Sequence, residues 1–344
     1  MMNKYDIVGG NILVIGDLHF SDKKDYGKHK NYLENCFDVL NQLDTIISEQ
    51  KPSGIVLLGD IVGNNETNVH SREQLSKFCK YLIRWNTYGP IFAVRGNHDL
   101  NGYPDFLFLD ELNLIISSSK CNGYFDFYAD NNSEIPATRF HIVDYKDEHR
   151  PLEICKGARN VVLGHNNYII PGLTNWYQQH EGLEFSKFPN FEDISLVISG
   201  HIHNPSPDFV STTMINGNVC SLYYPGCPTR PSKDVNCYDA CSVMRISYNE
   251  QSKLTDFAII PMQLKPMEEI FYDSAMITDK TEEEIENEMR MSALKDVLGD
   301  LLKYRMNQTD PLSQIDNIPN ATDKAKEIAK AYMIRALNNC GKVV

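Results

Sequence analysis

The stretch ILVIGDLH at residues 12–19 joins four apolar residues to a glycine, an aspartate and a histidine. A short run rich in isoleucine and valine is typical of a buried strand, and glycine lets the backbone turn sharply where such a strand ends. Asp17 and His19 are two residues apart, so in an extended chain both side chains point to the same side. The stretch therefore predicts a strand that carries two candidate ligands for one cation at its end.

The same pattern of apolar run, glycine and metal-binding side chain occurs four more times. The runs are residues 55–58 before GD, 91–94 before RGNHD, 161–163 before GH and 196–198 before SGHIH. Open α/β sheets bind ligands just beyond the carboxyl ends of their strands. We therefore expect five strand ends to converge on one site.

Seven side chains behind these runs form the candidate metal site: Asp17, His19, Asp60, Asn97, His165, His201 and His203. A carboxylate at position 60 could bridge two cations, and Asn97 offers an amide oxygen. A single GD or GH after a strand is more often a turn than a ligand, but here every motif follows its own apolar run. A set of oxygen and nitrogen donors without thiolates suits Mn, Fe or Zn better than Cu(I) or an iron–sulfur cluster.

Two segments between these runs have the spacing of amphipathic helices. They cover residues 28–50 and about 71–85, the second with Ser71 as a candidate N-cap. Their apolar positions are Leu33, Cys36, Phe37, Leu40, Leu43 and Ile47, then Leu75, Phe78, Cys79, Leu82 and Ile83. Strands that alternate with helices predict an α/β layered fold.

The pattern of the sequence changes after residue 207. Segments such as STTMINGNVCSLYYPG and ACSVMRISYNEQSKLTDFAII predict β-hairpins, which suggests a second sheet packed on the first. After Pro266 the chain becomes helical in pattern and charged, with helices expected over 281–306 and 322–339. We expect a catalytic domain over 1–266 and a helical C-terminal module over 267–344.

The net charge and the N-terminal sequence exclude some classes of protein. A net charge of −13 argues against general nucleic-acid binding through a basic face, although cations or a local basic strip can outweigh total charge near a site. The start, MMNKYDIVGG, lacks the apolar segment of a signal peptide, and no apolar run has the roughly 20 residues of a membrane helix. We expect a soluble protein of the cytoplasm without a membrane partner.

The nine cysteines of the chain are expected to be reduced, because secretion signals are missing. Cys220, Cys227, Cys237 and Cys241 lie close in sequence, and a zinc site is one interpretation. No C-x-x-C pair occurs among them, although most structural zinc sites contain one. Buried, reduced cysteines in strands are the favoured interpretation.

The order of the motifs over residues 12–203 resembles the calcineurin-like metallophosphoesterase superfamily. Within it the sequence is most similar to SbcD-type DNA repair exonucleases, including bacteriophage forms. GNHD with aspartate, and GDIVGNN in place of GDxxDRG, point away from Ser/Thr protein phosphatases. YPGCPTR at 224–230 resembles the YxGSP-type segment of SbcD-like nucleases. The resemblance implies a four-layer α/β/β/α sandwich.

The resemblance also implies roles for individual residues. Asp17, His19 and His203 would hold a first metal ion, Asn97, His165 and His201 a second, and Asp60 would bridge both. The ions would be Mn²⁺, with Fe or Zn as alternatives. His98 would face the scissile phosphate without binding metal.

Two arginines are candidates for substrate binding, and one glycine departs from the pattern of the superfamily. Arg95 and Arg230 could contact substrate phosphate, although Arg95 could equally form a surface salt bridge. Related enzymes often use the residue three positions after the bridging aspartate to position the catalytic histidine. Here that residue is Gly63, so Asn64, Asn65, His70 or the backbone would have to do so.

The function implied is two-metal-dependent hydrolysis of phosphodiesters by a DNA exonuclease or endonuclease in DNA repair or recombination. An SbcC-type ATPase would bind the C-terminal helices, in a bacterial or phage-infected cell, and a homodimer is a further option. The alternative is a phosphodiesterase or phosphatase that acts on small nucleotides or phosphoproteins. A scaffold without activity is disfavoured, because every ligand position is filled.

Overall fold

The computed structural model describes residues 4–21, 31–62, 72–100, 104–147, 150–169, 183–184, 190–206, 208–213, 217–231, 240–251, 254–271, 326–327 and 330. The chain divides into two compact units, Met1–Tyr272 and Asp273–Val344. Only three described residues belong to the second unit. The fold presented below is that of the first.

One sheet has six strands in the order β15-β14-β2-β3-β4-β5. Their bounds are β2 Asn11–Ile15, β3 Gly54–Leu57, β4 Ile91–Ala93, β5 Ile116–Ser117, β14 Ala240–Asn249 and β15 Leu254–Gln263. β2 to β5 run parallel, while β14 is antiparallel to both of its neighbours. The strands β3 and β4 are buried along their whole length, as expected for parallel strands covered on both faces.

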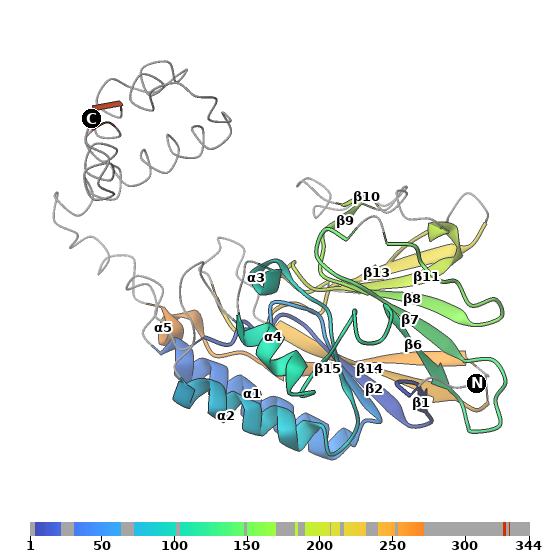
Figure 1. Ribbon diagram of the computed structural model, residues 1–344, viewed down its shortest axis with the longest axis horizontal. Coiled ribbons are helices and arrows are strands. Elements are labelled where there is room, and N and C mark those ends of the chain that lie inside the picture. The colour runs from blue at the N-terminus through green and yellow to red at the C-terminus, as the bar shows by residue number, and fades with distance from the viewer. Residues whose placement is uncertain are drawn as a thin grey trace, which may run out of the picture. The chain divides into compact units, whose positions relative to one another are not determined.

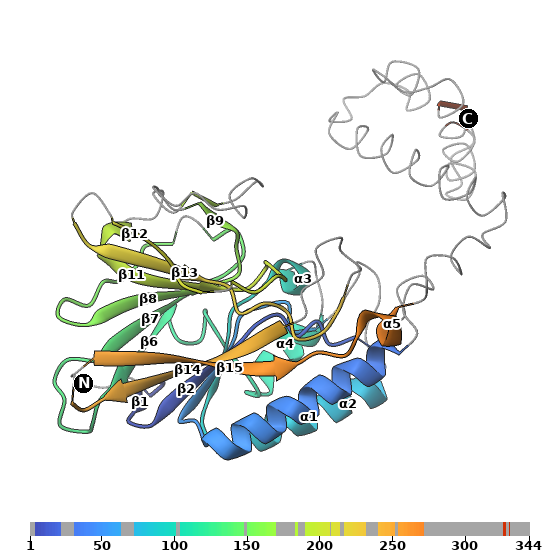
Figure 2. The same ribbon diagram turned by 180° about the vertical axis from the view of Figure 1, so that it is seen from behind.

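The other sheet has seven strands in the order β1-β6-β7-β8-β11-β13-β12. Their bounds are β1 Ile7–Val8, β6 Tyr124–Tyr128, β7 Thr138–Val143, β8 Arg159–Gly164, β11 Ile194–Ser199, β12 Val210–Thr213 and β13 Val219–Tyr223. The short strands β9, Tyr168–Ile169, and β10, Leu183–Glu184, pair separately. The two large sheets face each other (Figures 1 and 2).

The core between the sheets is apolar and aromatic. Phe92 of the six-stranded sheet stacks on Phe125 of the seven-stranded sheet, with ring centroids 3.8 Å apart, and Phe140 stacks on Phe125 at 5.1 Å. Aromatic contacts of this kind add to the stabilisation from buried area. The aromatic contact therefore fixes how the two sheets, and the strand ends that each carries, lie against each other.

Helices cover the other face of the six-stranded sheet. α1, Tyr32–Gln50, and α2, Arg72–Trp85, lie side by side on it (Figures 1 and 2), and their buried faces join the sheet in one hydrophobic cluster. The shorter helices are α3 Asn97–Leu100, α4 Pro104–Glu111, α5 Met267–Ile270 and the 3₁₀ turn Phe191–Asp193. None of the helices in the described residues is long and apolar enough to cross a membrane.

The predicted α/β fold, with two sheets flanked by helices, is confirmed. Both helices are found close to their predicted positions, but Ile83 is 53% exposed and Trp85 is buried instead. Trp85 lies seven residues after Phe78 and three after Leu82, on the same buried face of the helix, and its indole N–H donates to Asp44 Oδ1. The residue predicted to cap the second helix, Ser71, lies outside the described residues.

The two predicted hairpins form, but not as a sheet of their own. β12–β13 extends the seven-stranded sheet, whereas β14–β15 extends the six-stranded one. The expected second sheet packed on the first is present, but the two hairpins are divided between the two sheets. The physical reason for this division is that each hairpin covers an open edge of a sheet already begun by earlier strands.

Three of the four late cysteines are described. Cys220 in β13, Cys241 in β14 and Cys227 in the loop after β13 are buried and form no disulfide, as the favoured interpretation predicted, although Cys227 is not in a strand. Cys237 lies outside the described residues.

The predicted C-terminal module lies almost wholly outside the described residues, so it stays a prediction. Residues 267–271 are described, and Ile270 and Phe271 among them are buried in the hydrophobic cluster that α1 and α2 cover. These two residues fall within the predicted module but pack in the first compact unit.

Candidate metal centre

All seven predicted ligands lie at the carboxyl ends of parallel strands. Asp17 and His19 follow β2, Asp60 follows β3, and Asn97 begins the helix after β4. His165 follows β8, and His201 and His203 follow β11. The strands that carry the ligands belong to two facing sheets, β2, β3 and β4 to one and β8 and β11 to the other. The stacked core places both edges together.

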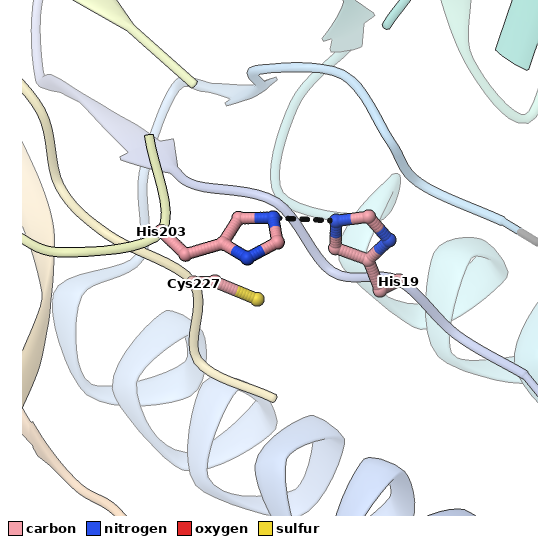
Figure 3. Close-up of side chains that lie close together, drawn as sticks. All are labelled: His19, His203 and Cys227. Atoms are coloured by element: carbon pink, nitrogen blue, oxygen red, sulfur yellow. Dashed lines mark hydrogen bonds between the residues drawn. The ribbon is translucent and has the colours of Figure 1, made fainter. Parts of the chain in front are cut away.

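A first group of side chains forms around His19. Its Nε2 lies 3.1 Å from Nε2 of His203, as the dashed line in Figure 3 shows, and 3.4 Å from Oδ2 of Asp60. Nε2 of His203 is 4.0 Å from Oδ2 of Asp17. Two imidazoles and two carboxylates thus turn their donor atoms toward one another.

A second group forms around Asn97. Its Oδ1 lies 3.1 Å from Nε2 of His165 and 3.1 Å from Nδ1 of His201. Nε2 of His165 is also 3.1 Å from Oδ2 of Asp60. The same carboxylate oxygen of Asp60 therefore faces His19 in the first group and His165 in the second.

Burial decides the charge of two imidazoles. It lowers the pKa of His19 to about 3 and that of His201 to about 4, by penalising the charged form. Neutral imidazole is the form that binds metal ions. Both side chains are therefore ready to act as ligands at neutral pH.

The carboxylates concentrate negative charge in the same place. Burial alone would raise the pKa of Asp60, but the charge of His165 and its hydrogen bond hold it well below its ordinary value. Burial lowers the pKa of His165, but Asp60 and Asp17 together raise it well above its ordinary value. Buried carboxylates of this kind require a positive partner.

A backbone carbonyl orients the imidazole of His165. Its Nδ1 is 2.6 Å from the carbonyl oxygen of Leu58, so Nδ1–H donates there. A bound metal ion would displace the proton on Nε2 and take its lone pair. Second contacts of this type fix the tautomer of metal-binding histidines. The sequence did not reveal this contact, because it joins residues 107 positions apart.

Three of the ligands have left-handed backbone conformations. The φ angle is 42° at His19, 45° at Asp60 and 76° at His201. Such angles are uncommon for residues other than glycine and cluster where function over-determines the backbone. The backbone N–H of His19 also donates to the carbonyl of Asp60 at 2.7 Å, which joins two of these turns.

His98 lies at the rim of the first group. Its side chain is 32% exposed, and Nε2 is 4.0 Å from Oδ2 of Asp60. Its ring meets that of His19 edge to face at 5.1 Å, and its backbone N–H donates to Oδ1 of Asp60 at 2.9 Å. The backbone thus holds His98 in place. Gly63, Asn64, Asn65 and His70 lie outside the described residues.

Asp99 is a residue of the site that the sequence analysis did not single out. It is 5% exposed and accepts from the backbone N–H groups of Gly96 at 2.9 Å and Ile61 at 3.2 Å. Burial and the nearby charge of Asp60 raise its pKa to about 7. Asp99 thus links the GNHD turn to the turn that carries Asp60. Its position in the GNHD motif is the feature of the sequence from which its role in the site could have been predicted.

The described contacts of the two arginines are with groups other than the seven ligands. The guanidinium of Arg95 packs over the ring of Phe106, 5.1 Å from its centroid, and its backbone N–H donates to Asp144. Arg230 is 3% exposed, and its Nε donates to the carbonyl of Lys265 at 3.0 Å. Substrate contact by either guanidinium therefore stays a prediction.

Glycine is required at position 200, between the two groups. A Cβ there would lie 2.1 Å from Oδ1 of Asp17, 2.5 Å from the carbonyl oxygen of Leu58 and 2.8 Å from Nδ1 of His165. We expect Gly200→Ala to displace both ligands and to weaken metal binding by about 10-fold or more, the scale of losing a contact that orients a ligand. Metal content by mass spectrometry checks this.

Gly217→Ala is the matched control, because nothing lies within 4 Å of a Cβ at that position. Its φ of 86° makes alanine strained there, so a stability cost of about 1 kcal/mol is expected with metal content unchanged. Full metal occupancy in Gly200→Ala would contradict the proposed crowding.

The residues present fit two divalent cations. Imidazole, carboxylate and amide donors converge in two groups that share one oxygen of Asp60, and buried negative charge is concentrated between them. Two-metal sites in which a carboxylate bridges the ions are typical of hydrolases that act on phosphoesters.

Comparison with known proteins gives the same class. Residues 10–205 match the calcineurin-like phosphoesterase family, and the chain belongs to it. The family is dimetal-dependent, so the protein is a metal-dependent phosphoesterase whose metal identity is open. None of the curated proteins matches the chain.

Two solved structures illustrate the similarity. A dimetal phosphatase from Danio rerio is 12% identical, with 74% of this chain and 99% of that chain covered and a TM-score of 0.43. The nuclease MPE of Pseudomonas putida is 15% identical, with 69% and 84% covered and a TM-score of 0.31.

Proposed function

We propose that the protein hydrolyses phosphodiesters of DNA with two metal ions, as an SbcD-type exonuclease or endonuclease of DNA repair or recombination. The observation that carries the proposal is the position of YPGCPTR, residues 224–230, which resembles a nuclease segment. The backbone N–H of Cys227 donates to the carbonyl of His203 at 3.0 Å. A Cβ on Gly16 would lie 2.0 Å from the carbonyl oxygen of Gly226. The segment therefore forms a wall of the metal centre.

The ligands are assigned from the two groups. Asp17, His19 and His203 hold one ion, Asn97, His165 and His201 hold the other, and Asp60 bridges them. When bound, the ions would supply Lewis-acid polarisation of the phosphate and a water acidic enough to react near neutral pH. Mn²⁺ is the proposed metal, with Fe or Zn as alternatives, because the donors are chiefly oxygen and nitrogen.

His98 acts on the substrate from the rim of this centre. Its exposed imidazole can reach a phosphate that approaches the ligands, while its backbone stays bound to Asp60. It stabilises the charge that develops on the phosphate oxygens or gives a proton to the leaving oxygen. Arg95 is the candidate for a further phosphate contact.

The remaining parts of the proposal rest on the sequence. The C-terminal segment 267–344 would bind an SbcC-type ATPase through an apolar helical face, in the cytoplasm of a bacterial or phage-infected cell. A homodimer would place two metal centres in one complex.

Substrate preference tests the proposal. The purified full-length chain is incubated with Mn²⁺ and either linear duplex DNA, supercoiled plasmid, bis-p-nitrophenyl phosphate, a 5′-mononucleotide or a phosphopeptide. We expect cleavage of DNA and of the diester, with little release of phosphate from the monoesters. A chelator should abolish activity, and addition of the ATPase with ATP should stimulate digestion of duplex DNA.

Asp60→Asn is the matched negative control for a contaminating nuclease. Cleavage of the mononucleotide or phosphopeptide in preference to DNA would support the alternative, a phosphatase or small-nucleotide enzyme. Equal DNA cleavage by the wild type and Asp60→Asn would assign the activity to a contaminant.

A further inference from the structure

Cys227 connects the two loops that carry ligands of the first group. Its backbone N–H donates to the carbonyl of His203. Its Sγ lies 3.0 Å from the carbonyl oxygen of Asp17 and 3.0 Å from that of Thr229. The side chain is fully buried, so its surroundings are set by these two loops.

The sulfur also faces the imidazoles of the first group. Ligand atoms of His19, His203 and Cys227 all lie within 4.8 Å of one another, and Figure 3 shows the three side chains together. Sulfur and nitrogen ligands of one tetrahedral zinc ion lie about 3.6 Å apart, because Zn–S is about 2.3 Å and Zn–N about 2.1 Å. Side-chain movements of about 1 Å are therefore enough to place all three on one cation.

We propose that Cys227 is an additional ligand of the first metal ion, and that it shifts the preference of this position toward thiophilic divalent cations such as Zn²⁺, one of the alternative metals of the proposed function. The inference rests on the metal centre of the proposed function. Thiolate favours zinc, whereas carboxylate and carbonyl oxygens suit manganese. When the metal–sulfur bond forms, the S–H proton leaves to solvent, and the sulfur no longer donates to a carbonyl.

The competing role for the sulfur is mechanical. As a thiol, Cys227 could simply donate to the carbonyl of Asp17 and hold its loop in place. Cys227→Ser separates the two roles, because a serine hydroxyl still donates to the carbonyl but is a poor ligand for a soft cation. Cys220→Ser is the matched control, since Cys220 is also fully buried, in β13 and outside the site.

Cobalt is the probe, because a bond between Co²⁺ and thiolate gives a charge-transfer band in the near-ultraviolet. The full-length chain is stripped with a chelator, reloaded with Co²⁺ and measured by absorption and by metal analysis. We expect the band in the wild type and in Cys220→Ser, and its loss in Cys227→Ser. In competition between Zn²⁺ and Mn²⁺, Cys227→Ser should lower the Zn:Mn occupancy ratio by about 10-fold or more, the scale of perturbing a metal's ligand shell.

The outcomes separate this inference from the proposed function. Two bound cobalt ions without the band, or a Zn:Mn ratio unchanged in Cys227→Ser, would overturn the role of Cys227 and leave the metal centre standing. A wild-type chain that binds no cobalt would overturn both.

Discussion

Asp60→Asn is expected to lower the turnover of bis-p-nitrophenyl phosphate by about 10³-fold or more. One oxygen of Asp60 faces both groups of ligands, so its charge serves two cations at once. Loss of several kcal/mol of charge stabilisation, at about 1.4 kcal/mol for each factor of ten, gives this magnitude. Turnover and metal content are measured on the same preparation.

Thermal unfolding of the same variant tests metal binding independently of turnover. Without metal, Asp60→Asn should be less stable than the wild type at neutral pH, because it removes one partner of the buried ion pair with His165. With Mn²⁺ added, the wild type should gain stability through binding, and the variant should gain much less. Asp256→Asn makes the same change at an exposed position of β15 and should behave as the wild type. Near-normal turnover in Asp60→Asn would refute the bridging assignment.

His98→Ala is expected to keep both metal ions and to lose about 10²–10⁴ in turnover, the range for general acid catalysis. Its hydrogen bond to Asp60 comes from the backbone, so removal of the imidazole leaves that contact in place. The imidazole is nevertheless close enough to Asp60 and His19 to be a candidate ligand. Metal content must therefore be measured together with turnover.

The leaving group distinguishes the two ways in which His98 could act. If it protonates the leaving oxygen, the loss in His98→Ala should be large for DNA and small for a nitrophenyl diester, whose leaving group needs no proton. A similar loss for both substrates would indicate stabilisation of charge on the phosphate oxygens. Loss of one metal ion would show that His98 is a ligand.

The five strand ends were predictable because each has a local signature. An apolar run, a glycine and a polar side chain within a few residues predict where a parallel strand ends, and five such ends imply convergence. The geometry that joins Asp17, Asp60 and His165 confirms this convergence. Their roles as metal ligands stay a proposal.

What the sequence could not predict depends on contacts between distant residues. The division of the strands between two sheets, the carbonyl of Leu58 that orients His165, and the packing of Cys227 against Asp17 all join positions far apart in the chain. The exposure of Ile83 was predictable in principle, because Trp85 and not Ile83 is in helical register with the buried Phe78 and Leu82.

The left-handed backbone at His19, Asp60 and His201 has a consequence for protein engineering. Glycine would relieve the steric cost at each position, which is about 1–2 kcal/mol for other residues. This relief is offset by the conformational entropy of glycine in the unfolded chain and by the lost contacts of the side chain, so a screen for heat resistance reports only the balance. Thermostable variants of this protein should be selected with metal occupancy as a second criterion, because any replacement at these positions removes a candidate ligand.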